Sequence, residues 1–492
     1  MNRGILLAVA LAAASLASAQ TSPDQQARGL LEDGRTYLKE GKLKQALDNF
    51  STIVSGFSTT DSVDDALLEI GRYQMDVEKN LERAREAFEQ VTKRYPQSDG
   101  APGAYYYLGM VILSRAAAPA EVEDALAQFA RVQRLYPGSE WVPKALYASA
   151  TAHRKAGRLP EAVDAGRRVF LEYPNSEAAP AAHFEVGHVL ALMGEPRQAM
   201  EEYQQIRNRF GGGEWAPRAL DRITALYRLY GSGKPAFVAD AGYAVGAGDV
   251  LKDVRALLMT PARTLWIASD KVKAVIPFSP EGKMGPGIPG VDLGSLTLAP
   301  SGEVVAAARL GVRLGPRDVR SYAIPTDKPG VPEPLERIQA AVVTPGGVVL
   351  VADGKKKRIF RFDPKQQFQG VFADNKDRDV TRMALDWEGG LVVLDQDAKS
   401  VQVFNEAGGL LRSIPVRGTG YELRRPVDVA VDPCRNLYVA DQEGGVLVFS
   451  QGGLLLTVVT GPELRKPSAV TVDPAGAILV YDAKTERVLR YK

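Results

Sequence analysis

The sequence predicts two folds in series, an α-solenoid of paired helices followed by a six-bladed β-propeller. In the first half, an alanine followed four residues later by an aromatic residue recurs at intervals of 37 to 41 residues. In the second half, a turn residue followed eight residues later by aspartate or a substitute recurs at intervals of 39 to 46 residues. Periods near forty are typical of helical repeats and propeller blades. A chain of 492 residues is also long enough for two or more separate cores.

The first residues have the pattern of a secretory signal. Arg3 precedes an apolar run, and the small residues Ala17 and Ala19 predict cleavage before Gln20, so residues 1–19 are left out of the fold. No cysteine follows the run, which argues against a lipoprotein anchor, and no later stretch reaches the roughly 20 apolar residues of a membrane-spanning helix. We therefore expect a periplasmic or secreted protein without a transmembrane segment.

The charge, cysteine and histidine content limits which partners and cofactors we expect. The formal net charge of +2 provides no general field for nucleic acid or anionic lipid, so no nucleic-acid partner is expected. Cys434 is the only cysteine, which excludes an intramolecular disulfide, and we interpret it as an ordinary turn residue because the C-terminal half has no histidine to activate it. His183 and His188 are five residues apart rather than the four that place two ligands on one helical face, so we expect no metal and no other cofactor.

Residues 20–230 are predicted to form five helix pairs and a final helix, Trp215–Tyr230, that caps the stack. Residues four apart share one helix face, so a small residue beside a large one lets two helices approach closely. These pairs are Ala46/Phe50, Ala84/Phe88, Ala125/Phe129 and Ala199/Tyr203, with the aromatic lost at Ala162/Gly166. Proline ends a second helix and serine can cap the next helix in three repeated endings, which are Tyr95-Pro96-Gln97-Ser98, Tyr136-Pro137-Gly138-Ser139 and Tyr173-Pro174-Asn175-Ser176.

These helix pairs resemble the tetratricopeptide repeat, whose first helix carries Leu-Gly and whose second carries alanine and an aromatic residue. Leu108-Gly109 matches that pattern, and Ile70-Gly71 and Val186-Gly187 match it with another aliphatic residue. The Tyr-Pro-x-Ser endings look like those of periplasmic Tol-associated and outer-membrane-assembly (BamD-like) proteins. The resemblance implies a protein-binding solenoid with a role in cell-envelope assembly or maintenance.

In such solenoids the first helices line a concave groove. Aligning them on their glycine positions predicts two rows of groove residues, namely Leu31, Leu68, Tyr106, Tyr147 and Phe184 in one row and Arg35, Arg72, Met110 and His188 in the other. Three consecutive tyrosines at 105–107 sweep about 200° of a helix and cannot all enter one core. An aromatic centre with a basic flank suits an extended or helical peptide with an acidic end. The alternative is that these side chains only fill space between neighbouring repeats.

Residues 231–250 are predicted to be a linker, because glycine and proline interrupt the helical pattern, and residues 251–492 to be the propeller. Units such as Pro426–Asp441, PVDVAVDPCRNLYVAD, resemble the blades of NHL-type six-bladed propellers. Blade anchors lie at positions 261, 300, 345, 387, 433 and 474. The last blade lacks a fourth strand, so we expect residues 236–245 to pair with Arg487–Tyr491 and close the ring.

Two sets of propeller side chains have alternative interpretations. The recurring Asp353, Asp395, Asp441 and Asp482 suggest either a ring of catalytic carboxylates or, as we prefer, acceptors for turn N–H groups. Among the channel positions, Ser295, Arg382 and Asp428 accompany three alanines, and Arg382 with Asp428 forms either an ion pair between two blades or part of a ligand site. The run Lys355-Lys356-Lys357 is interpreted as a solvated hairpin tip.

Two functions fit these features. The first is an exported, non-catalytic scaffold or adaptor that binds protein or peptide partners through the groove and the propeller face, with no catalytic residue assigned. The alternative is a propeller enzyme of the lactonase-like or metal-dependent hydrolase or lyase type. Such propellers gather carboxylates and often histidine at the channel mouth, whereas Asp428 is the only carboxylate among the six channel positions.

Overall fold

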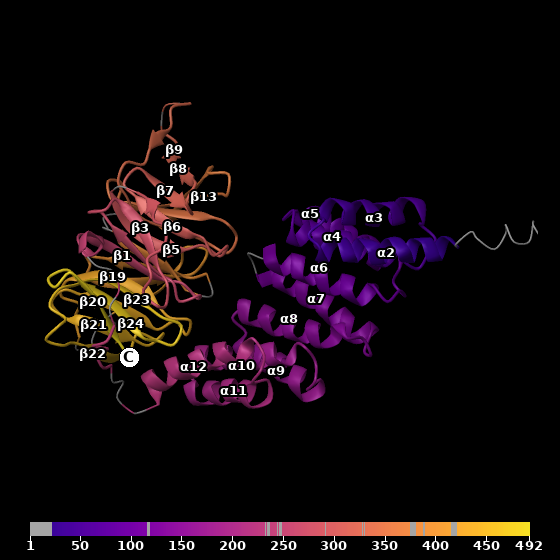
Figure 1. The fold of residues 1–492 in the computed structure, drawn as a ribbon, viewed down its shortest axis with the longest axis horizontal. Coiled ribbons are helices and arrows are strands. Elements are labelled where there is room, and N and C mark those ends of the chain that lie inside the picture. Colours follow the sequence, from indigo (N-terminus) through magenta and orange to yellow (C-terminus); the bar gives the residue numbers. More distant parts are fainter. Residues whose placement is uncertain are drawn as a thin grey trace, which may run out of the picture. The chain divides into compact units, whose positions relative to one another are not determined.

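The computed structural model describes residues 22–115, 119–231, 233, 237–243, 245, 248–290, 292–326, 328, 330–373, 380–386, 389–414 and 421–492. The predicted signal segment and its cleavage site, the linker residues Ala236 and Ala244, and the fourth blade anchor, Trp387, lie outside these residues. Figure 1 shows paired helices followed by the sheets of a propeller. The chain divides into two compact units, and the boundary between them in the sequence lies between Ala182 and His183.

The described residues contain eleven helices, which confirms five pairs followed by a single helix. The pairs are α2 (Pro23–Lys39) with α3 (Leu43–Gly56), α4 (Val63–Asp76) with α5 (Leu81–Arg94), α6 (Ala101–Arg115) with α7 (Pro119–Leu135), α8 (Trp141–Lys155) with α9 (Leu159–Glu172), and α10 (Ala179–Leu192) with α11 (Pro196–Arg209), followed by α12 (Trp215–Tyr230). The division into units falls inside α10, whereas the change from helix to strand lies between Tyr230 and Val254.

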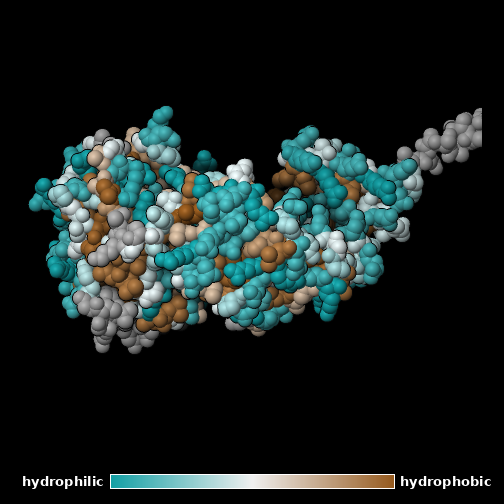
Figure 2. All heavy atoms as spheres, turned by 90° about the horizontal axis from the view of Figure 1, so that it is seen from below, coloured by the Kyte–Doolittle hydropathy of each residue, from teal (hydrophilic) through white to brown (hydrophobic). Residues whose placement is uncertain are grey.

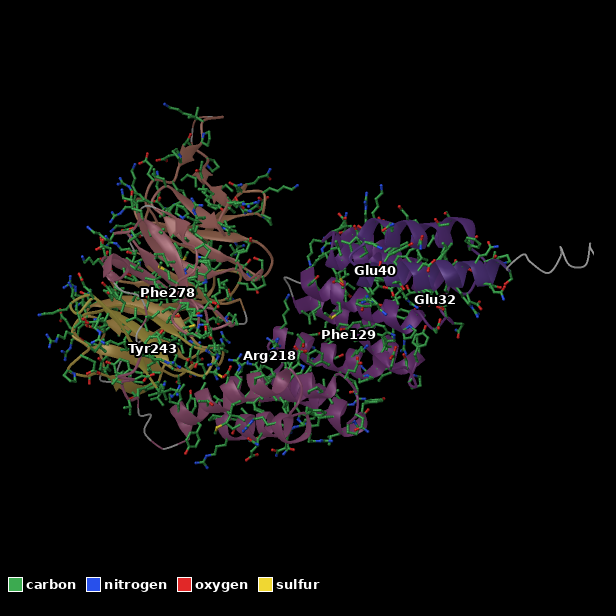
Figure 3. The ribbon with its side chains drawn as sticks, in the orientation of Figure 1. Glu32, Glu40, Phe129, Arg218, Tyr243 and Phe278 are labelled. Atoms are coloured by element: carbon green, nitrogen blue, oxygen red, sulfur yellow. The ribbon has the colours of Figure 1, made fainter. Side chains whose placement is uncertain are left out.

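In four of the five helix pairs, a glycine on the first helix makes room for the aromatic residue on its partner. A Cβ added to Gly71 would lie 2.4 Å from Phe88 Cε1, and one added to Gly109 would lie 2.4 Å from the Phe129 Cε1 atom. Phe129 is labelled among the helices in Figure 3. The same approach brings Gly34 against Phe50 at 2.5 Å and Gly187 against Tyr203 at 2.8 Å. The aromatic residues are fully buried, so this fit holds each pair together.

The Tyr-Pro-x-Ser endings form tight turns, but the serine hydroxyls do not act uniformly as the predicted caps. In each ending the serine N–H donates to the tyrosine carbonyl, at 3.1 Å for Ser98, 2.9 Å for Ser139 and 3.0 Å for Ser176. The Ser98 hydroxyl also donates back to Tyr95 O at 2.8 Å, whereas Ser139 Oγ accepts from the N–H of Trp141 at 3.2 Å. Backbone geometry, more than hydroxyl capping, therefore sets the turn.

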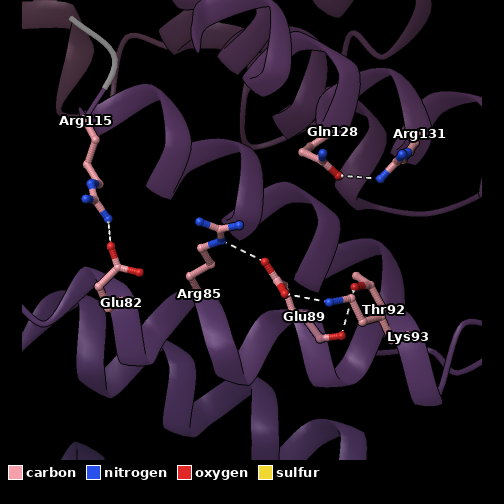
Figure 4. Close-up of polar contacts among 8 residues, drawn as sticks. All are labelled: Glu82, Arg85, Glu89, Thr92, Lys93, Arg115, Gln128 and Arg131. Atoms are coloured by element: carbon pink, nitrogen blue, oxygen red, sulfur yellow. Dashed lines mark hydrogen bonds and ion pairs between the residues drawn. The ribbon is translucent and has the colours of Figure 1, made fainter.

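Ion pairs cover the outer surface of the repeats. Glu89 on α5 accepts from both Arg85 and Lys93, each at 2.7 Å and four residues away, and Arg115 on α6 pairs with Glu82 (Figure 4). Hydrogen bonds from Lys93 and then Arg85 lower the pKa of Glu89. Exposed pairs of this kind contribute at most about 1 kcal/mol each. Hydrophilic residues likewise cover most of the surface seen in Figure 2.

Six sheets form the propeller, which confirms the predicted fold class. The first blade consists of β1 (Val254–Met259), β2 (Leu265–Ser269), β3 (Ala274–Phe278) and β4 (Ile288–Pro289), and the second of β5 (Leu293–Leu298), β6 (Val304–Ala308), β7 (Gly311–Leu314) and β8 (Asp318–Arg320). The third consists of β11 (Ile338–Val343), β12 (Val349–Asp353), β13 (Arg358–Phe362) and β14 (Phe368–Ala373), and the fourth of β15 (Val380–Leu385), β16 (Leu391–Asp395), β17 (Ser400–Phe404) and β18 (Leu410–Ile414). The fifth consists of β19 (Pro426–Val431), β20 (Leu437–Asp441), β21 (Gly445–Phe449) and β22 (Leu455–Val459), and the sixth of β23 (Pro467–Val472), β24 (Ile478–Asp482) and β25 (Arg487–Tyr491). A short hairpin, β9 (Ala323–Ile324) with β10 (Glu333–Pro334), is inserted after the second blade.

The last blade is completed by the segment that follows the helices, as expected. Ala239 forms an antiparallel bridge with Tyr491. Val238 and Lys492 exchange two backbone hydrogen bonds, of 2.8 and 2.9 Å, and Asp240 N donates to Arg490 O at 2.7 Å. This pairing satisfies the outer edge of β25 and closes the ring.

The recurring aspartates accept hydrogen bonds from turn backbones. Asp353 accepts from the N–H groups of Arg337, Lys355 and Lys356 at 2.8 to 3.1 Å, and Asp441 accepts from three backbone N–H groups in the same way. Burial acts to raise the pKa of Asp482, but hydrogen bonds from Lys466, Thr485 and Arg465 hold it below its usual value. Each of these carboxylates therefore joins a hairpin tip to the loop that enters the inner strand, which is the structural role preferred above.

Within the second unit, α12 contacts the turns at the far ends of the inner strands. Arg228 donates to Ala475 O at 2.7 Å, and the Tyr230 hydroxyl donates to Asn436 Oδ1 at 2.7 Å. Asp221 pairs with Arg263 in the corresponding turn of the first blade. The final helix was expected to cap the open end of the solenoid, and in the structure its side chains contact turns of the propeller.

Candidate functional site

The predicted groove residues differ in how much surface they offer. Leu31, Leu68 and His188 are buried, with 6 or 7% of their surface exposed, so they stabilise the helix stack and present almost no contact surface. This corrects their assignment as contact residues. Four other predicted groove residues keep part of their surface exposed, namely Tyr106, Met110, Tyr147 and Phe184.

The half-buried aromatic cluster in the first unit centres on Trp141, at the start of α8. Its ring centroid lies 5.3 Å from that of Tyr106 and 5.4 Å from that of Tyr107, and Gly103 leaves room for the indole. Lys144 Nζ lies 4.6 Å from the Trp141 ring centroid, in the range of a cation–π contact. Burial raises the pKa of Tyr106 to about 12, so this hydroxyl stays protonated at neutral pH. We call Tyr106, Tyr107, Trp141 and Lys144 the Trp141 cluster.

The basic flank predicted from Arg35 and Arg72 keeps part of its surface exposed, but both arginines form ion pairs with carboxylates of α4. Arg35 pairs with Glu69 at 3.1 Å and with Asp65 at 3.2 Å, and Arg72 pairs with the same Glu69 at 3.0 Å. Glu69 is buried, so its charge requires both partners. Arg72 also lies over the Tyr107 ring, with 5.8 Å between its guanidinium carbon and the ring centroid. Lys144 lies beside Trp141 and pairs loosely with Glu177, at 3.9 Å. Both cations therefore border the aromatic surface.

Sequence reasoning overlooked Trp141 although a signal was present. The pattern Glu-Trp-x-Pro-Lys/Arg-Ala-Leu occurs twice, at residues 140–146 and 214–220. In the second copy, Trp215 lies 5.2 Å from Phe184 between ring centroids, and Arg218 lies 5.0 Å from the Trp215 ring. Each copy thus begins a first helix with a tryptophan that covers an aromatic residue of the preceding one and carries a cation.

The propeller channel brings together two of its three predicted polar residues. Arg382 Nε lies 3.3 Å from Asp428 Oδ1, which confirms the ion pair between the fourth and fifth blades. Asp428 also accepts from the N–H of Val470 in the sixth blade at 2.8 Å. Arg382 reaches across the channel to donate to Arg255 O in the first blade at 3.0 Å. Ser295 is buried on β5, and no contact between it and the Arg382–Asp428 pair is seen.

Burial dominates the titration of Asp428. It raises the pKa of Asp428 to about 6, even though Arg382 and two backbone N–H groups favour the charged form. Arg382, in the fourth blade, therefore contacts both the first and the fifth blades, and Asp428 connects the fifth blade to the sixth.

A cavity of about 510 Å³ opens where the inner strands begin. Its charged lining consists of Arg255, Arg309, Arg337, Arg382, Asp270 and Asp292, a formal excess of two positive charges. Of the four arginines, only Arg382 was predicted to face the channel, because the others occupy different positions in their blades. We call this feature the arginine cavity.

The lysine run forms a hairpin tip in which Lys355 and Lys357 are exposed, and each lysine of the run also forms an ion pair. Lys355 pairs with Glu336 at 2.6 Å, Lys356 with Glu333 at 2.5 Å and Lys357 with Asp397 at 3.9 Å. The hairpin tip is therefore connected to neighbouring loops by three ion pairs rather than standing free in solvent.

Comparison with known proteins supports the helical repeat class. Residues 65–98 match the tetratricopeptide repeat. No curated protein has a significantly similar sequence. Among solved structures, a streptogramin B lyase is 10% identical with a TM-score of 0.39, covering 52% of this chain and 97% of its own. A protein described as a gluconolactonase is 15% identical with a TM-score of 0.41, with the same coverage.

A third structure, a catalytically inactive virginiamycin B lyase from Staphylococcus aureus with quinupristin, is 14% identical, with a TM-score of 0.39 and coverage of 52% of this chain and 85% of its own. The chain combines tetratricopeptide-type helical repeats with a six-bladed propeller. In the part of the chain that the structure describes, no helix has the length and apolarity to cross a bilayer.

Proposed function

We propose that the protein is an exported adaptor of the cell envelope, which binds protein partners through its helical repeats and propeller and catalyses no reaction itself. Tetratricopeptide repeats commonly bind proteins, and the match at residues 65–98 supports this general role. The N-terminal signal pattern supports export, and the Tyr-Pro-x-Ser endings support a place in the envelope.

The Trp141 cluster is the observation that carries this proposal. Tryptophan and tyrosine that keep part of their surface exposed are the side chains most often found at binding hot spots. Trp141, Tyr106 and Tyr107 are each partly exposed, and Tyr147, six residues after Trp141 on α8, is partly exposed as well. Lys144 adds a positive charge beside them, so the matching partner is a peptide with an apolar anchor and an acidic neighbour.

The test is capture of partners from a periplasmic fraction by the full chain. Tyr147→Ala and Lys144→Glu alter side chains that are partly exposed, so both variants should fold. Leu171→Ala is the matched control, because it removes an apolar side chain that is 73% exposed on the second helix α9. We expect the first two substitutions to abolish capture and the control to retain it; full capture by both test variants would refute the proposal.

Export is tested separately. Fractionation of the producing cell should recover a processed chain that begins at Gln20 in the periplasm or medium. Recovery of the full-length chain in the cytosol would contradict export without bearing on the repeat surface.

The alternative, a metal-dependent hydrolase or lyase, would place its metal at the channel mouth. There the lining includes four guanidinium groups, whose charge disfavours a divalent cation. Metal analysis of the purified protein separates the two functions, because a stoichiometric Ca²⁺ or Zn²⁺ ion would favour the enzyme.

A further inference from the structure

Two arginines of the arginine cavity point to a ligand because their charges have no evident protein partner. Arg309 and Arg337 both have exposed side chains, and no ion pair is formed by either within the described residues. Their backbones are adjacent, since Ile338 N donates to Arg309 O at 2.9 Å. Two like charges are therefore anchored side by side at one rim of the cavity.

Of the carboxylates near this rim, Asp292 is exposed in the cavity lining, and its carbonyl accepts from Arg309 N at 3.1 Å, whereas the others are already engaged. Glu336 pairs with Lys355 at 2.6 Å, and Asp353 accepts three backbone N–H groups. Asp270 pairs with Arg255 at 2.7 Å and accepts from Leu293 N at 3.0 Å. With Asp270 and Asp292 counted against the four arginines, the lining keeps a formal excess of two positive charges that an anion from solution can neutralise.

The other two arginines are fixed in place. Arg255 is held by Asp270 and by Asp253, at 2.7 and 3.2 Å, and Arg382 is held by Asp428 and by the carbonyl of Arg255. The cavity thus has a rigid cationic wall opposite two uncommitted guanidinium groups. Such preorganisation lowers the entropic cost of binding a small ligand.

The cavity is also at the accessible end of the channel within its unit. Val254 pairs with Ser269 at the cavity end of the first blade, and Met259 pairs with Leu265 at the turn end. The contacts of α12 are with the turns, which a six-residue strand separates from the cavity by about 20 Å. The helices of the second unit therefore seat the propeller on its opposite face.

We propose that the arginine cavity binds a small multivalent oxyanion, a phosphate- or polycarboxylate-bearing metabolite, through Arg309 and Arg337. Guanidinium groups bind such oxygens in a bidentate manner, and a volume of about 510 Å³ is that of a small-molecule site. The net charge of the whole chain is only +2, so the attraction is local to this cavity. The site does not depend on the adaptor function, because it involves neither the helical repeats nor a protein partner.

The test is calorimetric titration of the full chain with pyrophosphate and with citrate at constant ionic strength. We expect saturable binding of at least one probe at one site per chain. Arg309→Gln combined with Arg337→Gln should weaken that binding by about tenfold or more, since each loses charge-assisted hydrogen bonds. Arg487→Gln is the matched control: it removes an exposed arginine that does not line the cavity and should leave the affinity unchanged.

The outcomes divide cleanly. Binding of pyrophosphate alone assigns a phosphorylated ligand, and binding of citrate alone assigns a polycarboxylate. Arg309→Lys with Arg337→Lys keeps the charge but loses the forked geometry, and it should bind more weakly than the native chain. Absence of binding by both probes, or equal weakening by the Arg487→Gln control, overturns the proposal.

Discussion

Replacing Gly71 by alanine should destabilise the helical repeats, although alanine is the better helix former. The new Cβ would lie 2.4, 2.7 and 2.8 Å from three ring atoms of Phe88, whereas carbon atoms pack at about 3.5 to 4.0 Å. Phe88 is fully buried and stacks on Tyr107 with 5.3 Å between ring centroids, so the ring cannot move aside freely. Overpacking costs about 1–3 kcal/mol and alanine recovers about 1 kcal/mol of helix propensity, which leaves a net loss of up to about 2 kcal/mol.

Gly29 provides the matched control. It lies inside α2, and nothing lies within 4 Å of the position where its Cβ would be. Gly29→Ala should therefore stabilise the chain by about 0.5–1 kcal/mol. Urea unfolding of the full-length variants, followed by circular dichroism of the helices, measures both changes.

A second substitution tests whether the ring is the cause. Phe88→Leu alone should cost stability through lost burial, but in the Gly71→Ala background its cost should shrink, because the smaller side chain relieves the clash. If Gly71→Ala instead stabilised the chain as much as Gly29→Ala, the proposed fit between glycine and aromatic ring would be refuted.

Three further predictions concern the propeller. Val238→Pro removes the N–H that donates to Lys492 O and should lower the thermal midpoint, whereas Val238→Ala should not, because that side chain is 69% exposed; equal midpoints would show that ring closure is dispensable. Burial raises the pKa of Asp428 to about 6, so the folded chain binds a proton there as the pH falls, before the unfolded chain does. In unfolding experiments, the free energy of unfolding of the native chain should therefore rise by about 1.4 kcal/mol relative to that of Asp428→Asn between about pH 7.5 and about pH 5. A difference between the two chains that does not change with pH would contradict this shift. Burial, then Asp432, raises the pKa of Cys434 to about 12, so the thiol should resist a disulfide reagent until the chain unfolds, and rapid labelling of the native protein would disprove its burial.

Local chemistry made much of the fold predictable. Pro433 and Asp441 recur at a fixed interval because each blade repeats the same turn and the same acceptor for backbone N–H groups. The helix pairs could be predicted for the same reason, since a glycine such as Gly71 fits against an aromatic residue such as Phe88 in four of the five pairs. The pairing that closes the ring could also be predicted, because the last blade lacks an outer strand in the sequence and another segment has to supply it.

The features that escaped prediction depend on residues brought together by the fold. Arg309 follows a second strand and Arg337 precedes an inner strand, so no single register reveals that they share a cavity. The pairing of Arg72 with a buried Glu69 was also missed, because charge at a helix surface does not show which neighbour neutralises it. The contact between Tyr230 and Asn436 leaves no periodic signal at all.

The strand that completes the sixth blade has a consequence for the order of biosynthesis. Residues 238–240 emerge from the ribosome just after α12, but their hydrogen-bond partners are residues 490–492. The earlier helical repeats have mostly neighbouring partners and can fold during synthesis, whereas the ring stays open until β25 has been made. During that interval Leu229, which is buried against the last two blades, remains uncovered, so a nascent chain needs protection at this point more than at any earlier one.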